Sequence, residues 1–140
     1  MTSALSIGIR MAQAASLDET LEVAYEAFQQ VLTVIHTYED SGGSFYGALI
    51  MAAAAAANGR DIIAAAPSLP AASHPARLGA VLPVAAGSAE TAAHVAAISA
   101  AVASGLIRAA GIATEPADRE ACTEAVDCAR EIHGLATGHD

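Results

Sequence analysis

The first group of residues that could do chemistry is the stretch His-Thr-Tyr-Glu-Asp at residues 36–40, near the end of a predicted helix. On a helical wheel Glu39 falls on the apolar side with Ile35, and His36 lies at the border of that side. A carboxylate directed at a core is partly desolvated, and such a group suits a general base or a metal ligand. Glu39 and His36 are therefore the candidate catalytic residues. The alternative is that Glu39, in the last helical turn, is exposed to solvent.

Aromatic residues gather around the turn that follows this stretch. Four of the five aromatic residues in the chain belong to this region: Tyr25, Tyr38, Phe45 and Tyr46. Small-molecule pockets have mostly apolar walls with a few converging polar groups. We take four residues as candidate ligand-binding positions: Tyr25, Tyr38, Ser44 and Tyr46. In the alternative interpretation the same rings close one end of an alanine-rich core.

Glu90 and His94 form the second group, because a spacing of four residues puts both side chains on one side of a helix. Carboxylate and imidazole groups from facing helices build the metal sites inside helical bundles. These two residues are the candidate metal ligands. The full dinuclear pattern, with Glu-x-x-His and a further Glu on each of the other helices, does not occur, so a surface pair is the simpler interpretation. We therefore expect no resident metal or other cofactor.

Other catalytic motifs are missing from the sequence. Residues 41–44, Ser-Gly-Gly-Ser, lack the lysine and the spacing of a P-loop, and no Gly-x-Ser-x-Gly occurs. Cys122 and Cys128 lie six positions apart, unlike the Cys-x-x-Cys of zinc and redox sites. On one helix they are separated by about 9 Å of axial rise, so we expect no intrachain disulfide. Free thiols fit a reducing cytoplasm.

Composition indicates that helices must position these groups. The chain has 140 residues, the size of one domain, and contains 38 alanines but only two Phe and no Trp. Alanine has the highest helix propensity and packs poorly in a pleated sheet, so an all-α fold is predicted. Six isolated arginines and 15 carboxylates give a net charge of −9, which argues against a nucleic-acid partner.

Neither membrane insertion nor secretion is expected. The longest uncharged apolar stretches, residues 45–57 and 95–107, are shorter than the roughly 20 residues that span a bilayer. Near the N-terminus, Arg10 follows the apolar residues 5–9 instead of preceding them, which differs from a secretory signal. We therefore expect a cytoplasmic protein.

Apolar periodicity and capping residues divide the single domain into an N-terminal segment, 1–15, and four helices. The second helix either stops at Asn58-Gly59 or continues towards Pro67. A proline-rich arm separates the second helix from the third. The expected fold is a compact four-helix bundle. The predicted helices span residues 16–40, 44–66, 88–111 and 115–133, with the arm at 67–87.

Small residues at a spacing of four on the predicted helices 44–66 and 88–111 would let another helix approach closely. Because alanine buries little surface, association with a second copy would add burial, so we expect a homodimer formed through these two faces. The leading functional interpretation is a non-catalytic helical interaction or regulatory module. The alternatives are a small cofactor-independent enzyme or ligand-binding protein with a pocket at the first inter-helix turn, and a metal-binding bundle.

Overall fold

The computed structural model describes residues 4–40, 47–69 and 88–138, and the predicted all-helical fold is confirmed for these ranges. The predicted number of helices differs, because the described residues form five helices and not four. Most of the predicted proline-rich arm, residues 70–87, lies outside the described residues. The helices are α1 (Ala4–Gln13), α2 (Leu17–Asp40), α3 (Gly47–Ala64), α4 (Ser88–Ile112) and α5 (Pro116–Thr137).

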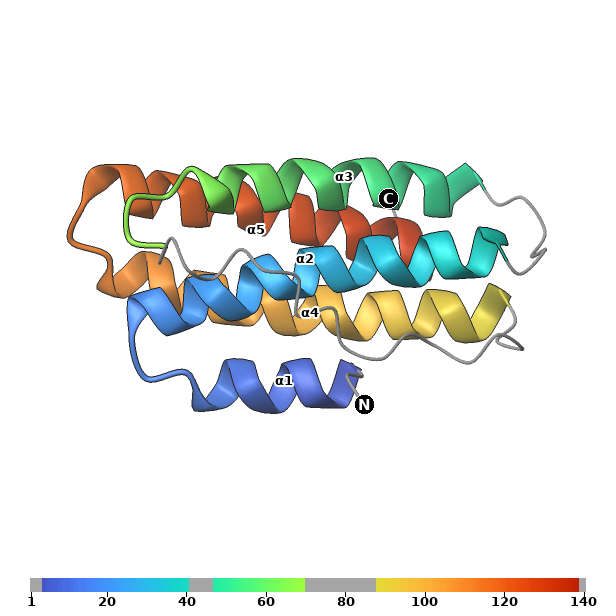
Figure 1. The fold of residues 1–140 in the computed structure, drawn as a ribbon, viewed down its shortest axis with the longest axis horizontal. Helices are drawn as coiled ribbons and strands as arrows, with labels where there is room; N and C mark the ends of the chain where they lie inside the picture. Colours follow the sequence, from blue (N-terminus) through green and yellow to red (C-terminus); the bar gives the residue numbers. More distant parts are fainter. Residues whose placement is uncertain (1–3, 41–46, 70–87, 139–140) are drawn as a thin grey trace.

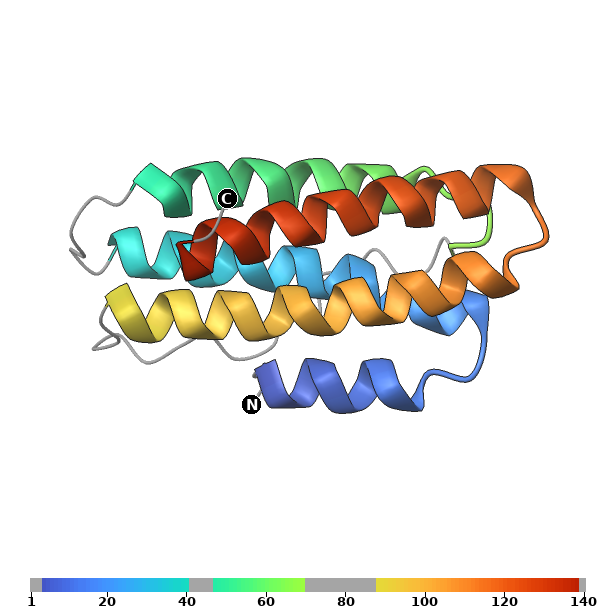
Figure 2. The same cartoon turned by 180° about the vertical axis from the view of Figure 1, so that it is seen from behind.

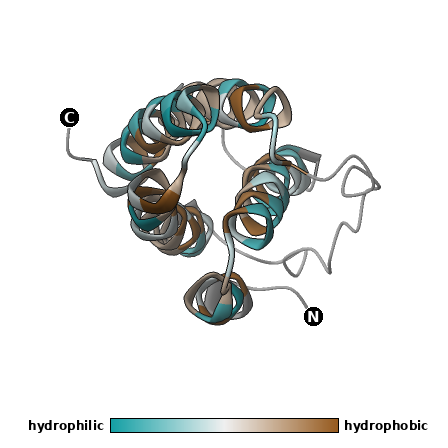
Figure 3. Cartoon of the chain, turned by 90° about the vertical axis from the view of Figure 1, so that its left-hand side faces the viewer, coloured by the Kyte–Doolittle hydropathy of each residue, from teal (hydrophilic) through white to brown (hydrophobic). Residues whose placement is uncertain are grey.

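Helices α2 to α5 surround one core, and α1 packs against its outside (Figures 1 and 3). Around the core α5 packs on α3 and α4, and α2 completes the ring by packing on the same two helices. Figures 1 and 2 show that each helix of the ring runs antiparallel to its two neighbours. Consequently α3 and α4 lie diagonally across the bundle and run in the same direction.

The N-terminal segment 1–15, for which the sequence predicted no helix, contains α1. Ile7 and Met11 are buried one turn apart, and Met11 lies over Gly105 of α4, where no Cβ stands in its way. The Nη2 group of Arg108 donates a hydrogen bond of 2.8 Å to the Met11 carbonyl oxygen at the end of α1. An isolated helix of ten residues is marginal in water, so these contacts with α4 stabilise it.

Helix α3 continues through Asn58-Gly59 to Ala64, which resolves the two alternatives for this segment. Gly59 keeps helical dihedrals, because Gly138 is the one described residue with a positive φ. Its role is steric: a Cβ at Gly59 would stand 2.6 Å from two carbons of the Phe28 ring, which is 1% exposed. The glycine therefore lets α2 and α3 approach closely in the core.

The last helix extends beyond its predicted end before Gly134. It continues to Thr137, and Gly138 adopts the left-handed conformation with φ 80° and donates its backbone N–H to the Gly134 carbonyl oxygen. Glycine is the residue that adopts this conformation without a steric cost. The helix-stopping glycine is therefore the second of the two in this segment.

The start of the connection between α3 and α4 is attached to α5. Asp118, in the first turn of α5, is fully buried. Its carboxylate accepts hydrogen bonds from the backbone N–H of Ser68 at 3.0 Å and from the Ser68 hydroxyl at 2.5 Å. Both carboxylate oxygens accept a hydrogen bond, so this buried group is satisfied and holds the chain that follows α3.

Candidate functional site

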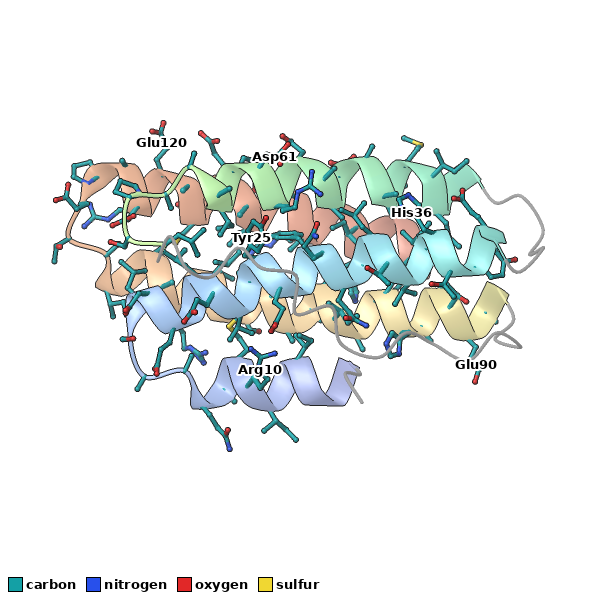
Figure 4. All side chains as sticks on the ribbon, in the orientation of Figure 1. Arg10, Tyr25, His36, Asp61, Glu90 and Glu120 are labelled. Carbon is teal, nitrogen blue, oxygen red and sulfur yellow. The ribbon has the colours of Figure 1, made fainter. Side chains whose placement is uncertain are left out.

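The two candidate groups lie at the same end of the bundle. Because neighbouring helices are antiparallel, α2 ends where α3 and α4 begin, at the right-hand end in Figure 1. This end carries the candidates of residues 36–39 together with Glu90 and His94. Tyr25 is separated from His36 by about 16 Å along α2 and lies near the middle of the bundle (Figure 4). The proposed pocket residues Ser44 and Tyr46 lie outside the described residues.

The candidate catalytic residues of α2 do not enclose a site. His36 and Glu39 are both exposed, whereas Tyr38 is buried with 7% of its surface accessible. Of the two alternatives for Glu39, the structure has the exposed one, with the side chain facing solvent in the last turn of α2.

The candidate metal ligands also differ in their surroundings. Glu90 is exposed and points away from the bundle in Figure 4, whereas His94 is half-buried and its Nε2 atom is buried without a hydrogen-bond partner. Desolvation by burial lowers the pKa of His94 from its usual 6.5. Within the described ranges no three His, Cys, Asp or Glu side chains are grouped closely enough to hold a metal ion.

A residue that the sequence interpretation missed lies one turn before this histidine. Thr91 is fully buried, and its hydroxyl oxygen has no hydrogen-bond partner. Its spacing from Val95, Ile98 and Val102 places it on the buried stripe of α4, so the wheel pattern already contained this signal. Two buried polar atoms without partners thus lie on successive turns of α4. Such groups are costly and call for an explanation.

The two cysteines are buried and chemically quiet. Burial, together with the negative charge of Asp118, raises the pKa of the Cys122 thiol to about 11. Burial also raises the pKa of Cys128, with smaller contributions from nearby acidic residues, and the Nδ2 amide of Asn58 donates to its sulfur at 3.6 Å. Because the thiolate is the nucleophilic form, neither residue is activated for catalysis.

The most unusual surface belongs to α4. We call its ten exposed residues the α4 outer face, which lies towards the viewer between α5 and α1 in Figure 2. Its exposed residues from 93 to 107 are small or apolar and uncharged, and Ile107 and Ile112 are 50% and 57% exposed. The full set is Ala89, Glu90, Ala93, Ala97, Ala100, Ser104, Ile107, Arg108, Gly111 and Ile112.

The outer surfaces of α5 and α3 differ from the α4 outer face. On α5 more than half of the exposed residues are charged, and they include Glu120, Glu124 and Asp127. On α3 the exposed side begins with the apolar residues Ile50 and Met51, but Asn58 and Asp61 follow within two turns of Ala54. By length and composition, α4 is also the helix in the described part of the chain that is apolar enough to cross a membrane, a property common to core helices of soluble proteins.

Comparison with known proteins returns no match: no protein-family model, no curated protein and no solved structure is significantly similar to this chain.

Proposed function

We propose that this chain is a non-catalytic helical interaction module that forms a homodimer through the α4 outer face. The observation that carries the proposal is the uncharged, exposed stretch of this face from residue 93 to residue 107. Most of an ordinary surface helix resembles α5, with charged residues exposed to water. A continuous exposed apolar patch on a folded domain is typical of an interaction site.

The sequence predicts a dimer formed through the small-residue faces of both α3 and α4, and the geometry of the bundle favours an interface formed by only one of them. Helices α3 and α4 lie diagonally across the bundle from each other, so their exposed sides point in opposite directions. One two-fold interface cannot contain both. Of the two exposed sides, the α4 outer face has the longer uncharged stretch, from residue 93 to residue 107. A net charge of −9 disfavours association through the acidic outer surface of α5.

The positions of the chemically capable groups also support a non-catalytic role. His36 and Glu39 are exposed, and the pKa of each thiol is raised by burial. A general base or nucleophile acts through a partner held within hydrogen-bond reach. The described contacts of these residues provide no such pair.

Size-exclusion chromatography with light scattering tests the proposal. The wild-type protein is expected to be a dimer at micromolar concentration. Ala100→Glu places a charge in the middle of the α4 outer face and is expected to give a monomer, because an unpaired charge would have to be buried in the interface. Ala54→Glu, at an exposed alanine of α3 on the opposite side, is the matched control and should remain a dimer.

Two results would contradict this proposal. One is a monomeric wild-type protein at about 100 μM, a concentration at which even weak specific dimers form. The other is flotation of the wild-type chain with phosphatidylcholine vesicles that Ala100→Glu abolishes, which would assign the same face to a membrane surface.

A second candidate function, a small-ligand site, is favoured by Thr91 and His94. A polar ligand would satisfy the two buried atoms that have no partner. Native mass spectrometry of the purified wild-type protein should then show a bound small molecule that Thr91→Val loses, and elemental analysis separates a metal from an organic ligand. Protein of unliganded mass, together with increased stability of Thr91→Val, would contradict this candidate.

A further inference from the structure

The two charged residues of the α4 outer face are placed symmetrically. Glu90 and Arg108 are both exposed, and their separation of 18 positions corresponds to five helical turns, so both lie on the same side of α4. They are about 27 Å apart along the helix axis. The exposed residues between them are uncharged, and Ala97 and Ala100 flank the midpoint.

This placement distinguishes the two ways in which two copies of α4 can pair. In an antiparallel pair with its two-fold axis at residue 99, Glu90 of each copy lies opposite Arg108 of the other copy. The same flank of both helices meets across an antiparallel pair, so the two side chains also lie on one side of the contact. In a parallel pair the corresponding flanks of the two helices lie on opposite sides of the contact and each charge is level with its own duplicate, so neither charge gains a partner of opposite sign.

We propose that the partner of the α4 outer face is a second copy of the chain in antiparallel orientation, with Glu90–Arg108 ion pairs at both ends of the contact. This inference rests on the function proposed above and specifies the geometry of the same interface. The interface is isologous, as a closed two-fold dimer requires. Each dimer contains two equivalent ion pairs.

The seam between the two helices consists of small residues and Ile107, with the spacing of a helical pair. The exposed positions follow alternate steps of four and three residues, which is the repeat that keeps one side of a helix against a partner. Small side chains at these positions permit a short distance between the axes. The seam residues are Ala93, Ala97, Ala100, Ser104, Ile107 and Gly111.

Arg108 can serve both α1 and the second copy. One of its N–H groups is used by the Met11 carbonyl, and a guanidinium carries five donors in all. The remaining donors are available to a carboxylate across the interface. The same arginine thus links the docking of α1 to the end of the dimer contact.

Charge reversal tests the orientation. In the antiparallel dimer Glu90→Arg replaces two attractive pairs by two repulsive ones, so the dissociation constant should rise about tenfold, given the usual strength of exposed pairs. The double variant Glu90→Arg/Arg108→Glu recreates both pairs with their signs exchanged and should recover most of this loss. Arg108→Gln, which removes a charge without reversing it, controls for the lost bond to α1.

A distance measurement tests the orientation independently of these variants. A nitroxide attached to the cysteine of Ala89→Cys should give a distance of about 30 Å between the two copies in the antiparallel dimer. In a parallel dimer the same labels would lie within about 10 Å and broaden the spectrum strongly. The native thiols do not compete for the reagent, because Cys122 and Cys128 are buried with raised pKa values.

The outcomes separate this inference from the proposed function. In one outcome Ala100→Glu disrupts the dimer, the labels lie at the short distance, and Glu90→Arg leaves the dissociation constant unchanged. This outcome refutes the antiparallel orientation but not the α4 outer face as the interface. A wild-type monomer refutes both. The long label distance together with rescue by the double variant supports both.

Discussion

Replacing Gly59 by alanine tests whether the close contact between α2 and α3 limits the stability of the bundle. Two effects oppose each other. Alanine in the interior of a helix is more favourable than glycine by about 1 kcal/mol. Against this, the new Cβ would stand 2.6 Å from the Phe28 ring, whereas ordinary van der Waals contact begins at 3.4 Å.

The ring or the helix must therefore move by the difference between these distances, 0.8 Å. Phe28 is among the largest fully buried side chains, so its ring is enclosed by other protein atoms. Inserting a carbon into such a packed core costs about 1–3 kcal/mol or more. The contact is made by rigid ring carbons, so we expect a cost near the upper end and a net loss of about 1–2 kcal/mol after the gain in helix propensity.

Thermal and urea unfolding of Gly59→Ala and Gly8→Ala measure this balance. A Cβ at Gly8, in α1, would have no other atom within 4 Å, so this substitution isolates the gain in helix propensity. For a chain of this length we expect the Tm of Gly59→Ala to fall by about 4–8 °C and that of Gly8→Ala to rise by a few degrees.

A double variant makes the assignment specific to the ring. Phe28→Leu removes the two contacting carbons, so adding Gly59→Ala in that background should cost less than it does in the wild type. If Gly59→Ala is as stable as the wild type or more stable, the ring contact does not restrict this position and the explanation given for the glycine is wrong.

Three further results are expected. Because burial lowers the pKa of His94 below 6.5, the folded state binds its proton less readily than the unfolded state, so stability should fall as the pH drops below 6.5. Urea unfolding at pH 7.5 and 5 should show a smaller loss for His94→Gln, and an equal loss would contradict the desolvation of this ring. Asp118→Ala should cost about 1–3 kcal/mol in urea unfolding, because the Ser68 N–H loses its acceptor, with Ser68→Ala less costly. Cys122 and Cys128 should resist a thiol reagent at pH 8 until urea unfolds the chain, and rapid labelling of the native protein would contradict their burial.

The parts of the fold that could be predicted are those in which local pattern and tertiary environment agree. In α2 the apolar residues that recur with helical periodicity on one side, among them Leu21, Phe28 and Ile35, are buried. The all-helical class followed from the alanine content, and it is confirmed. Both the apolar periodicity and the alanine content are repeated over many residues, so neither prediction depends on a single tertiary contact.

The parts that could not be predicted depend on single contacts between distant residues. Helix α1 is stabilised by Met11 against Gly105 and by Arg108, which are more than 90 positions away in the chain. The role of Gly59 depends on the Phe28 ring, because a glycine required for close approach looks the same in sequence as one required to end a helix.

The candidate site shows the same division. The wheel position of Glu39 described its side of the helix but not whether another element covers the last turn, and the structure leaves that residue exposed. The burial of Thr91 could be predicted from its helical spacing to Val95 and Ile98. The absence of a partner for its hydroxyl could not, because that depends on which groups the other helices place beside it. The exposure of the α4 outer face depends on which sides α1, α2 and α5 cover, which no local pattern contains.

The diagonal placement of α3 and α4 has a consequence for biosynthesis. Both helices pack on α5, which the ribosome produces after them, so a nascent chain that ends before Pro116 leaves the α5-facing sides of both helices uncovered. Those sides are alanine-rich and apolar, and they have no partner in the chain made so far. The core can therefore close only after α5 has emerged from the ribosome, so the last steps of folding follow the synthesis of that helix. Shielding of the uncovered sides of α3 and α4 by a chaperone would be most useful immediately before α5 appears.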